Sequence, residues 1–145
     1  MNITQSPAGP SILVTGTSSD SHTWNLVYLQ LLLEEAGCRV TNLGACVPPV
    51  LVAAECLARD PDLVVVSSVN GHGGADGLRL IEVLRAQPDL AGTPVVIGGK
   101  LATDGLRNVG LVRRLRAAGY DAVFDNGDLA RFRTLISRLS ARVAS

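Results

Sequence analysis

The segment Asp62–Ser68, DLVVVSS, predicts a β-strand that lies in the interior of a parallel sheet. Its consecutive valines are β-branched, and the run lacks the polar alternation expected of a strand with one solvent-exposed face. Uninterrupted apolar runs of this kind are typical of strands that helices cover on both sides. We therefore expect this segment to be a central strand of an α/β domain.

Segments on either side of this strand alternate between short apolar runs and longer helical patterns, as in repeated strand–helix units. Further strands are predicted at residues 12–16, 39–43, 94–97 and 121–124. Helices are predicted at residues 24–36, 50–59, 76–86, 106–118 and 128–141. This alternation predicts a doubly wound, five-stranded parallel sheet of the flavodoxin-like (Rossmann-like) type. We expect a single domain over residues 12–143, preceded by a flexible N-terminus, residues 1–11.

The composition argues against several classes of function. Thirteen basic and 13 acidic residues give no net charge, which disfavours a nucleic-acid-binding surface, and the C-terminal arginines are spaced as the solvated face of a helix. No apolar stretch approaches the ~20 residues of a membrane span. The polar N-terminus lacks the pattern of a signal peptide, and the three cysteines form no CxxC pair. We expect a cytoplasmic protein whose cysteines are reduced and buried.

Ligands of such sheets bind beyond the carboxyl ends of the strands, near the point where the strand order reverses. Most of the loops at that edge contain glycine, which lets a bulky ligand approach the backbone closely. The loops concerned are residues 17–23, 44–49, 69–75, 98–105 and 125–127. We expect the functional site to be built from these loops.

Other functions of this fold fit the loops poorly. The loop after the first strand, GTSSD at residues 16–20, lacks the G-x-G-x-x-G pattern of dinucleotide-binding enzymes. The central strand ends in VSS at residues 66–68, without the acceptor aspartate of a phosphorelay receiver. A flavodoxin remains open because the hydroxyl-rich first loop could bind a phosphate, but flavin rings are usually held between aromatic side chains. Aromatic residues are few here, and we assign Trp24 and Tyr28 to the core.

The first loop contains Asp20-Ser21-His22, a pattern that allows a carboxylate to orient a metal-binding imidazole. A carboxylate two residues before a histidine can accept the Nδ1 proton, which leaves Nε2 as the ligand atom. The alternative is structural: Asp20 or Ser21 caps the following helix, and His22 is an exposed residue of its first turn. No second ligand stands at metal-binding spacing nearby, so a bare zinc site is disfavoured. A macrocyclic cofactor needs only one protein ligand.

Three loop motifs together resemble the signature of the cobalamin-binding domain family. That signature is Asp-x-His-x-x-Gly, then Ser-x-Leu, then Gly-Gly, and the matching segments here are Asp20–Asn25, Ser67–Val69 and Gly98–Gly99. The likeness runs from about residue 12 to the last helix, and it extends to the small (sigma) subunits of glutamate mutase (methylaspartate mutase). Each motif alone is weak, but their combination in the correct loops and order is specific.

The resemblance implies a role for each matching residue. His22 would displace the dimethylbenzimidazole of the cofactor and serve as the axial ligand of cobalt, with Asp20 holding its other ring nitrogen. Two departures concern the pocket of the nucleotide tail: Asn25 replaces the final glycine of the first motif, and Val69 replaces leucine. Cofactor-binding residues implied beside Asp20 and His22 are Ser19, Ser21, Thr23, Asn25, Ser67, Ser68, Val69, Gly98, Gly99, Lys100, Leu101, Ala102, Thr103, Phe124 and Gly127.

The resemblance also implies the function. The chain would be the small subunit of an adenosylcobalamin-dependent carbon-skeleton mutase that converts L-glutamate to 3-methylaspartate by radical chemistry. It would carry the cofactor base-off/His-on, contribute no catalytic side chain, and be inactive without a large barrel-type subunit docked on its cofactor face, as in a heterotetramer.

Two alternatives stay open. One is a corrinoid carrier for methyl transfer, which is disfavoured because such carriers add an N-terminal helical cap and only 11 residues precede the first predicted strand. The other is a non-catalytic cobalamin-binding or flavodoxin-like module.

Overall fold

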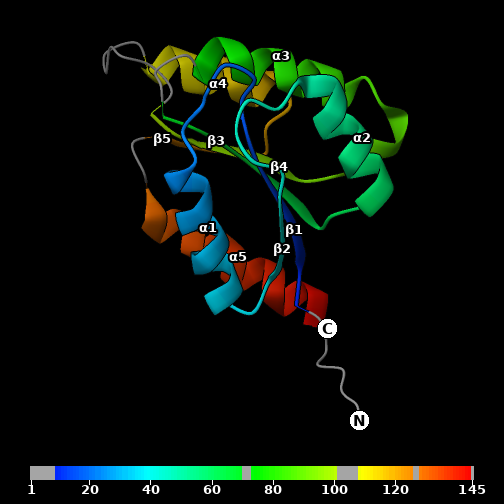
Figure 1. Ribbon diagram of the computed structural model, residues 1–145, viewed down its shortest axis with the longest axis vertical. Coiled ribbons are helices and arrows are strands. Elements are labelled where there is room, and N and C mark those ends of the chain that lie inside the picture. Colours follow the sequence, from blue (N-terminus) through cyan, green and yellow to red (C-terminus); the bar gives the residue numbers. More distant parts are fainter. Residues whose placement is uncertain (1–8, 70–72, 101–107, 126–127, 145) are drawn as a thin grey trace.

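The computed structural model of the chain describes residues 9–69, 73–100, 108–125 and 128–144. One sheet, in which every strand is parallel to its neighbours, forms the centre of the molecule (Figure 1). The strands are β1 (Ser11–Gly16), β2 (Arg39–Asn42), β3 (Leu63–Ser68), β4 (Val95–Gly99) and β5 (Ala122–Asp125). Their spatial order is β2-β1-β3-β4-β5, which is the flavodoxin-like order, so the predicted fold class is confirmed.

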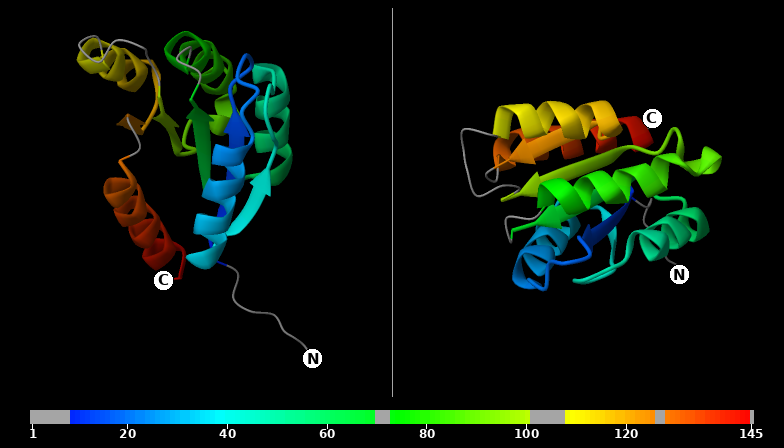
Figure 2. Two further views of the ribbon diagram at one scale, coloured as in Figure 1. Left: turned by 60° about the vertical axis from the view of Figure 1, so that its left-hand side comes forward. Right: turned by 90° about the horizontal axis from the view of Figure 1, so that it is seen from above.

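Helices cover both faces of this sheet (Figures 1 and 2). On one face lie α1 (Trp24–Glu35) and α5 (Leu129–Ala144), and on the other lie α2 (Pro49–Arg59), α3 (Gly73–Arg85) and α4 (Asn108–Ala118). A short 3-10 helix, η1 (Pro88–Leu90), precedes β4 and has no counterpart in the prediction. Within the described ranges, no helix is long and apolar enough to span a bilayer.

The central strand β3 holds the two helical layers together. All of its residues are buried. Leu63 and Val65 pack with α1 and α5, whereas Val64 and Val66 pack with α2, α3 and α4. Successive side chains of a strand point to opposite faces, and burying each aliphatic side chain contributes about 1.5–3 kcal/mol relative to leaving it exposed. The uninterrupted apolar run therefore stabilises both layers at once.

The start of α3 differs from the prediction because glycines take part in helix packing. The helix is predicted from residue 76 but begins at Gly73. At Gly74 a Cβ atom would lie 2.8 Å from the side chain of Leu111 in α4, and at Gly77 it would lie 2.6 Å from the side chain of Ile97 in β4. Glycine here allows close contact between elements rather than marking a loop. The remaining boundaries agree to within one helical turn, and residues 106–107 of the predicted fourth helix lie outside the described residues.

The assignment of Trp24 and Tyr28 to the core is wrong. Trp24 is 83% exposed and Tyr28 is 50% exposed. The buried stripe of α1 is formed by Leu26 and Leu33, and a residue two positions from Leu26 stands about 200° around the helix. Trp24 therefore faces solvent, whereas the half-exposed Tyr28 borders a cavity at the side of the helix. The arginines of α5 are exposed, as their spacing predicts.

The prediction of buried cysteines is correct for Cys38 and Cys56 and wrong for Cys46. Burial, with nearby Glu55 adding to its effect, raises the pKa of the Cys56 thiol to about 11. Cys46 is exposed in the loop after β2, where its φ of 55° lies in the left-handed region. This loop lies at the carboxyl edge of the sheet, beyond the region that the helices cover, so Cys46 is exposed to solvent.

The end of β4 also differs from the prediction. The strand is predicted to stop at residue 97, but it continues through Gly98 and Gly99, which pair with Ser67 and Ser68 of β3. Gly99 has a φ of +109°, and a Cβ atom there would lie 2.1 Å from the carbonyl oxygen of Ser68. Only glycine fits both this backbone conformation and this contact.

We expect Gly99→Ala to lower the free energy of unfolding by at least about 2 kcal/mol, because the left-handed backbone strain adds to a clash with backbone atoms. Urea unfolding of the purified chain measures this change. Gly110→Ala in α4 is the matched control, since a Cβ atom there meets nothing within 4 Å. That substitution should raise the free energy of unfolding by about 0.5–1 kcal/mol. Equal effects of the two substitutions would contradict the packing described for Gly99.

Candidate functional site

The carboxylate of Asp20 joins the two loops that leave the switch point between β1 and β3. Asp20 follows β1 and is 1% exposed. Its Oδ1 accepts hydrogen bonds from the backbone N–H of His22 at 2.9 Å and from His22 Nδ1 at 2.7 Å. Its Oδ2 accepts a hydrogen bond from the backbone N–H of Val69, directly after β3, at 2.7 Å. One buried side chain thus fixes the imidazole and the spacing of both loops.

Hydrogen bonds keep Asp20 ionised despite its burial. Burial takes water away from the carboxylate, and by itself it would raise the pKa of Asp20. The backbone N–H groups of His22 and Val69, together with the side chains of His22 and Ser68, donate to the charged form and outweigh the effect of burial. The pKa of Asp20 therefore lies below its ordinary value. The carboxylate is charged at neutral pH and can hold the proton of Nδ1.

His22 offers one ring nitrogen to a ligand. Its side chain is 58% exposed. Because Nδ1 contacts a carboxylate, we assign the proton of the neutral ring to Nδ1, and Nε2 then carries the lone pair. Among the described residues, no three His, Cys, Asp or Glu side chains gather into a metal site. The geometry suits a metal that brings its other ligands with it, as the metal of a macrocycle does.

Helix capping does not account for Asp20. The N-cap residue of α1 is Thr23, which makes no side-chain cap hydrogen bond. Asp20 binds Val69 and His22 rather than the first turn of the helix, and Ser21 is exposed. The orienting contact between Asp20 and His22 is the arrangement that the sequence predicts.

A second buried carboxylate, Asp76 of α3, holds the same loop, and no sequence pattern predicts this contact. Asp76 is 4% exposed. Its Oδ2 accepts hydrogen bonds from the backbone N–H of Ser19, at 3.3 Å, and from the Ser19 hydroxyl, and its Oδ1 pairs with Arg79. Ser19 is predicted to contact the cofactor, yet its hydroxyl is bonded to Asp76. The one available signal, an acidic residue in the first turn of a helix, normally indicates only a favourable helix dipole.

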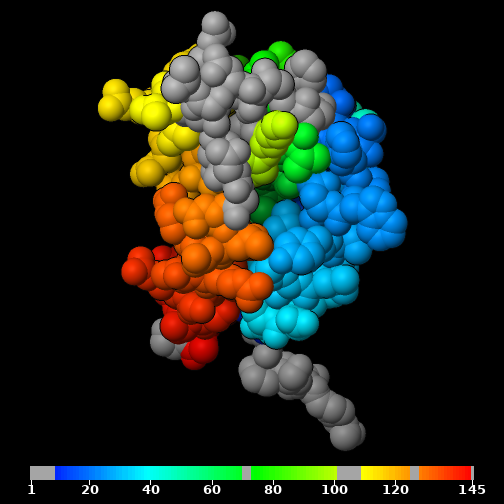
Figure 3. Space-filling model, turned by 90° about the vertical axis from the view of Figure 1, so that its left-hand side faces the viewer, coloured from blue at the N-terminus to red at the C-terminus, as the bar shows by residue number. Residues whose placement is uncertain are grey.

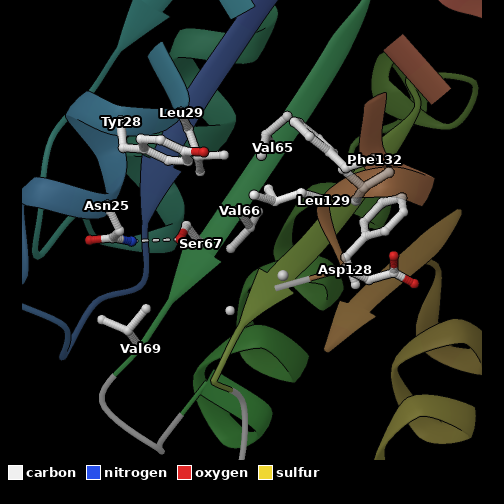
Figure 4. A pocket seen from close by; sticks show the side chains of 14 residues that line it. Asn25, Tyr28, Leu29, Val65, Val66, Ser67, Val69, Asp128, Leu129 and Phe132 are labelled. Atoms are coloured by element: carbon white, nitrogen blue, oxygen red, sulfur yellow. Dashed lines mark hydrogen bonds between the residues drawn. The ribbon is translucent and has the colours of Figure 1, made fainter. Parts of the chain in front are cut away.

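An apolar cavity lies between α1 and α5. The space-filling view shows the hollow between these helices, and the close-up shows strands of the sheet behind it (Figures 3 and 4). Its volume is about 230 Å³. The predicted residues that line it are Asn25, Ser67, Val69, Gly98, Gly99 and Phe124. Since these come from four elements (α1, β3, β4 and β5) and the loop after β3, the fold brings together residues that are far apart in the sequence.

The remaining predicted residues lie elsewhere. Ser68 is fully buried and bonds the Asp20 carboxylate instead of lining the cavity. Ser21, Thr23 and Lys100 are exposed at the carboxyl edge of the sheet. The predicted residues outside the described ranges are Leu101, Ala102, Thr103 and Gly127.

Several lining residues are absent from the prediction. Tyr28 and Leu29 come from α1, Val65 and Val96 from the sheet, and Leu129 and Phe132 from α5. Their spacing along the helices is the ordinary spacing of core residues, so the sequence offers no means of separating a cavity wall from a packed core. Their apolar character makes the cavity suitable for a flat, largely hydrophobic group.

Asn25 connects the two sides of the cavity wall. Its Nδ2 donates a hydrogen bond to Ser67 Oγ at 2.6 Å, which ties the start of α1 to the end of β3 (Figure 4). Its Oδ1 is buried and has no hydrogen-bond partner in the described part of the chain. The glycine of the family signature would leave this space open. The substitution therefore alters the wall of the cavity and leaves the Asp20–His22 pair intact.

Comparisons with known proteins identify the family of the chain. A family model described as "B12 binding domain" matches residues 10–131. The glutamate mutase sigma subunit of Halobacterium salinarum is 34% identical over 119 residues, which cover 82% of this chain and 78% of that subunit. The HTH-type transcriptional repressor CarA of Myxococcus xanthus is 34% identical over 108 residues, which cover 74% of this chain and 36% of the repressor. The chain therefore spans about a third of the repressor's length.

The fold agrees with a solved structure as well. A cobalamin-binding protein from Desulfitobacterium hafniense superimposes with a TM-score of 0.67 and 21% identity, covering 79% of this chain and 52% of that one. At this identity the likeness concerns the fold alone. The family match spans most of the chain, and it includes the Asp20–His22 pair and the strand ends around the cavity. The chain belongs to the B12-binding domain family.

Proposed function

We propose that this chain is the cobalamin-carrying small subunit of an adenosylcobalamin-dependent mutase of the glutamate mutase type. The observation that carries the proposal is the Asp20–His22 pair, held at the switch point beside the apolar cavity. Relatives named glutamate mutase sigma subunit, which match most of the chain, support the choice of enzyme. The cofactor would bind base-off/His-on, with His22 Nε2 on cobalt and the displaced nucleotide tail in the cavity.

The residues present fit such a cofactor. The donor set is one imidazole whose tautomer is fixed by a charged carboxylate, which is what a metal already held by a macrocycle needs. The cavity beside it is lined by apolar side chains and by Gly98 and Gly99 of β4. The space at Gly98 is narrow, because a Cβ atom there would lie 3.1 Å from the Phe124 carbonyl oxygen. When bound, adenosylcobalamin supplies homolysis of its cobalt–carbon bond and hence a radical that takes hydrogen from the substrate.

The side chains of this chain bind and orient. Asp20 holds the Nδ1 proton of His22, the Val69 N–H fixes Asp20, and the apolar cavity between α1 and α5 would exclude water from the nucleotide tail. The substrate site would come from a large barrel-type subunit that docks on the cofactor face. In this proposal the chain acts in the cytoplasm as one subunit of a hetero-oligomer.

A second candidate function is a cobalamin-binding module of a regulatory protein. The similarity to a transcriptional repressor over 74% of this chain favours it. In both proposals His22 would bind the cobalt, so measurements of cobalamin binding would not separate the two functions. Activity with a partner does.

Mixing the purified chain with adenosylcobalamin and the large subunit of a glutamate mutase should give turnover of L-glutamate to 3-methylaspartate. Each protein alone should be inactive, because one supplies the cofactor and the other the substrate site. Formation of 3-methylaspartate, followed by absorbance or chromatography, is the measurement. Tight cobalamin binding without turnover in the presence of matched large subunits would favour the regulatory module.

The wild type should bind adenosylcobalamin with the benzimidazole displaced, and His22→Ala should lose this state. The visible spectrum at saturation reports the axial ligand, and titration gives the Kd. Since His22 supplies the only coordinate bond proposed from the protein, we expect the Kd to rise at least about tenfold. Glu35→Gln, at an exposed position at the other end of α1, is the control. An unchanged spectrum and Kd in His22→Ala would show that the ligand is assigned wrongly.

Asp20→Asn should lower the free energy of unfolding of the cofactor-free chain by about 1–3 kcal/mol at pH 7, because a buried, hydrogen-bonded charge is lost. The folded-state pKa of Asp20 is depressed, so its stabilisation is present above the unfolded pKa and is lost as the pH falls through the folded pKa. The difference between wild type and variant should therefore shrink in acid. Urea unfolding from pH 7 to pH 3 tests this, with Glu55→Gln in an exposed ion pair as control. A difference that stays constant with pH would contradict the charged state of Asp20.

A further inference from the structure

The loop that carries His22 is held by contacts from three other parts of the fold. Val69, after β3, donates to the Asp20 carboxylate at 2.7 Å, and Cys46, after β2, donates its backbone N–H to the Asp20 carbonyl oxygen at 3.0 Å. The third contact comes from Asp76, whose carboxylate accepts both the N–H and the hydroxyl of Ser19. Asp76 is the only one of these partners that belongs to a helix.

Asp76 connects this loop to the helical layer on the opposite face from the cavity. Its helix, α3, packs on β3 and β4 with α2 and α4 as neighbours. The other end of α3 is fastened by Arg85, which donates to the carbonyl oxygens of Leu90, Thr93 and Gly119 at 2.7–3.2 Å. Because Arg85 fastens one end of α3 and Gly74 packs closely against Leu111 of α4 near the other, Asp76 gives the loop a rigid reference point. Such a reference matters for Asp20, which is adjacent to Ser19 in the chain.

The two carboxylates divide one task. Asp20 sets the orientation of the His22 ring, and Asp76 fixes the position of the loop, relative to α3, that carries Asp20 and His22. Arg79 occupies the other oxygen of Asp76, so the carboxylate is held in place when it binds Ser19. His22 would have to replace another nitrogen as the ligand of a metal, and prior positioning of the loop favours this exchange. The conformational entropy of the loop is then lost during folding, so it does not reduce the affinity for the cofactor.

We propose that Asp76 is a positioning residue for metal ligation by His22, acting through Ser19 and without touching the cofactor. The cobalt itself rests on the function proposed above, whereas the hold on the loop concerns the free protein. In this proposal Ser19 does not need to contact the cofactor, because its hydrogen bonds to Asp76 hold the loop that carries His22.

The test compares Asp76→Ala with Arg85→Ala, two substitutions that break buried hydrogen-bond networks at opposite ends of the same helix. Amide hydrogen exchange of the cofactor-free chain should become about tenfold faster at Asp20 and His22 in Asp76→Ala and stay unchanged there in Arg85→Ala. The Kd for adenosylcobalamin should rise about tenfold in Asp76→Ala only, with a smaller His-on fraction in the visible spectrum at saturation. Urea unfolding records the stability that each variant loses.

Ser19→Ala keeps the backbone bond to Asp76 and removes only the hydroxyl bond, so it is the milder variant if Asp76→Ala folds poorly. In the double variant, the effects on Kd should be less than additive, because both substitutions break one contact. A loss of stability in Asp76→Ala with unchanged exchange at Asp20 and His22 and unchanged Kd would overturn the proposal. So would a Kd effect of Ser19→Ala that persists in full without Asp76.

The design separates this proposal from the function on which it rests. If the His22→Ala variant has the same visible spectrum and the same Kd for adenosylcobalamin as the wild type, the proposed cobalt ligand is refuted. The exchange comparison uses the free protein, so it would still decide whether Asp76 holds the loop.

Discussion

A buried carboxylate at the switch point of the sheet is the constraint on which the site depends. Asp20 accepts hydrogen bonds from the loop after β1 and from the loop after β3, so its carboxylate joins the two loops. Burial alone works against the charge, so the donors around it must be in place for the carboxylate to remain ionised. The same bonds that stabilise the charge also fix the tautomer of His22. Folding and ligand chemistry therefore share one set of contacts.

The sheet separates a tightly packed side from a side with a cavity. Toward α2, α3 and α4, glycines at positions 74 and 77 bring the elements into close contact. Toward α1 and α5, a cavity lies over the ends of β3 and β4, and Gly98 adds no side chain to its wall. Asp76 lies on the packed side and reaches the loop that serves the other side. The rigid layer can thus support a site that it does not itself line.

Much of the fold could be predicted because its signals are local. An apolar run such as residues 62–68 has a strand conformation and burial on both faces as its simplest interpretation, and the structure agrees. Glycines carried two meanings, however: Gly73 opens a helix and Gly99 continues a strand, although both look like loop residues in the sequence. Likewise the side chain of Trp24 is of a type common in protein cores, and only its angular position around α1 exposes it to solvent.

The site could be predicted to the same extent. The Asp20–His22 contact joins residues two positions apart, so the sequence displays it, whereas the Ser19–Asp76 contact joins residues 57 positions apart and depends on how α3 packs on the sheet. The walls of the cavity are ordinary apolar residues, and which of them face an empty space depends on how far α1 stands from α5. Long-range placement of this kind has no signature in a single sequence.

The exposed Trp24 gives the molecule an optical property. It is the single tryptophan of the chain, it is 83% exposed, and it stands two residues after His22 at the start of α1. The fluorescent indole of Trp24 therefore lies close to His22. A strongly absorbing ring bound at His22 would be near enough to quench this fluorescence by energy transfer. The intrinsic fluorescence of the chain is therefore a built-in gauge of whether the site is filled, with no label to be attached.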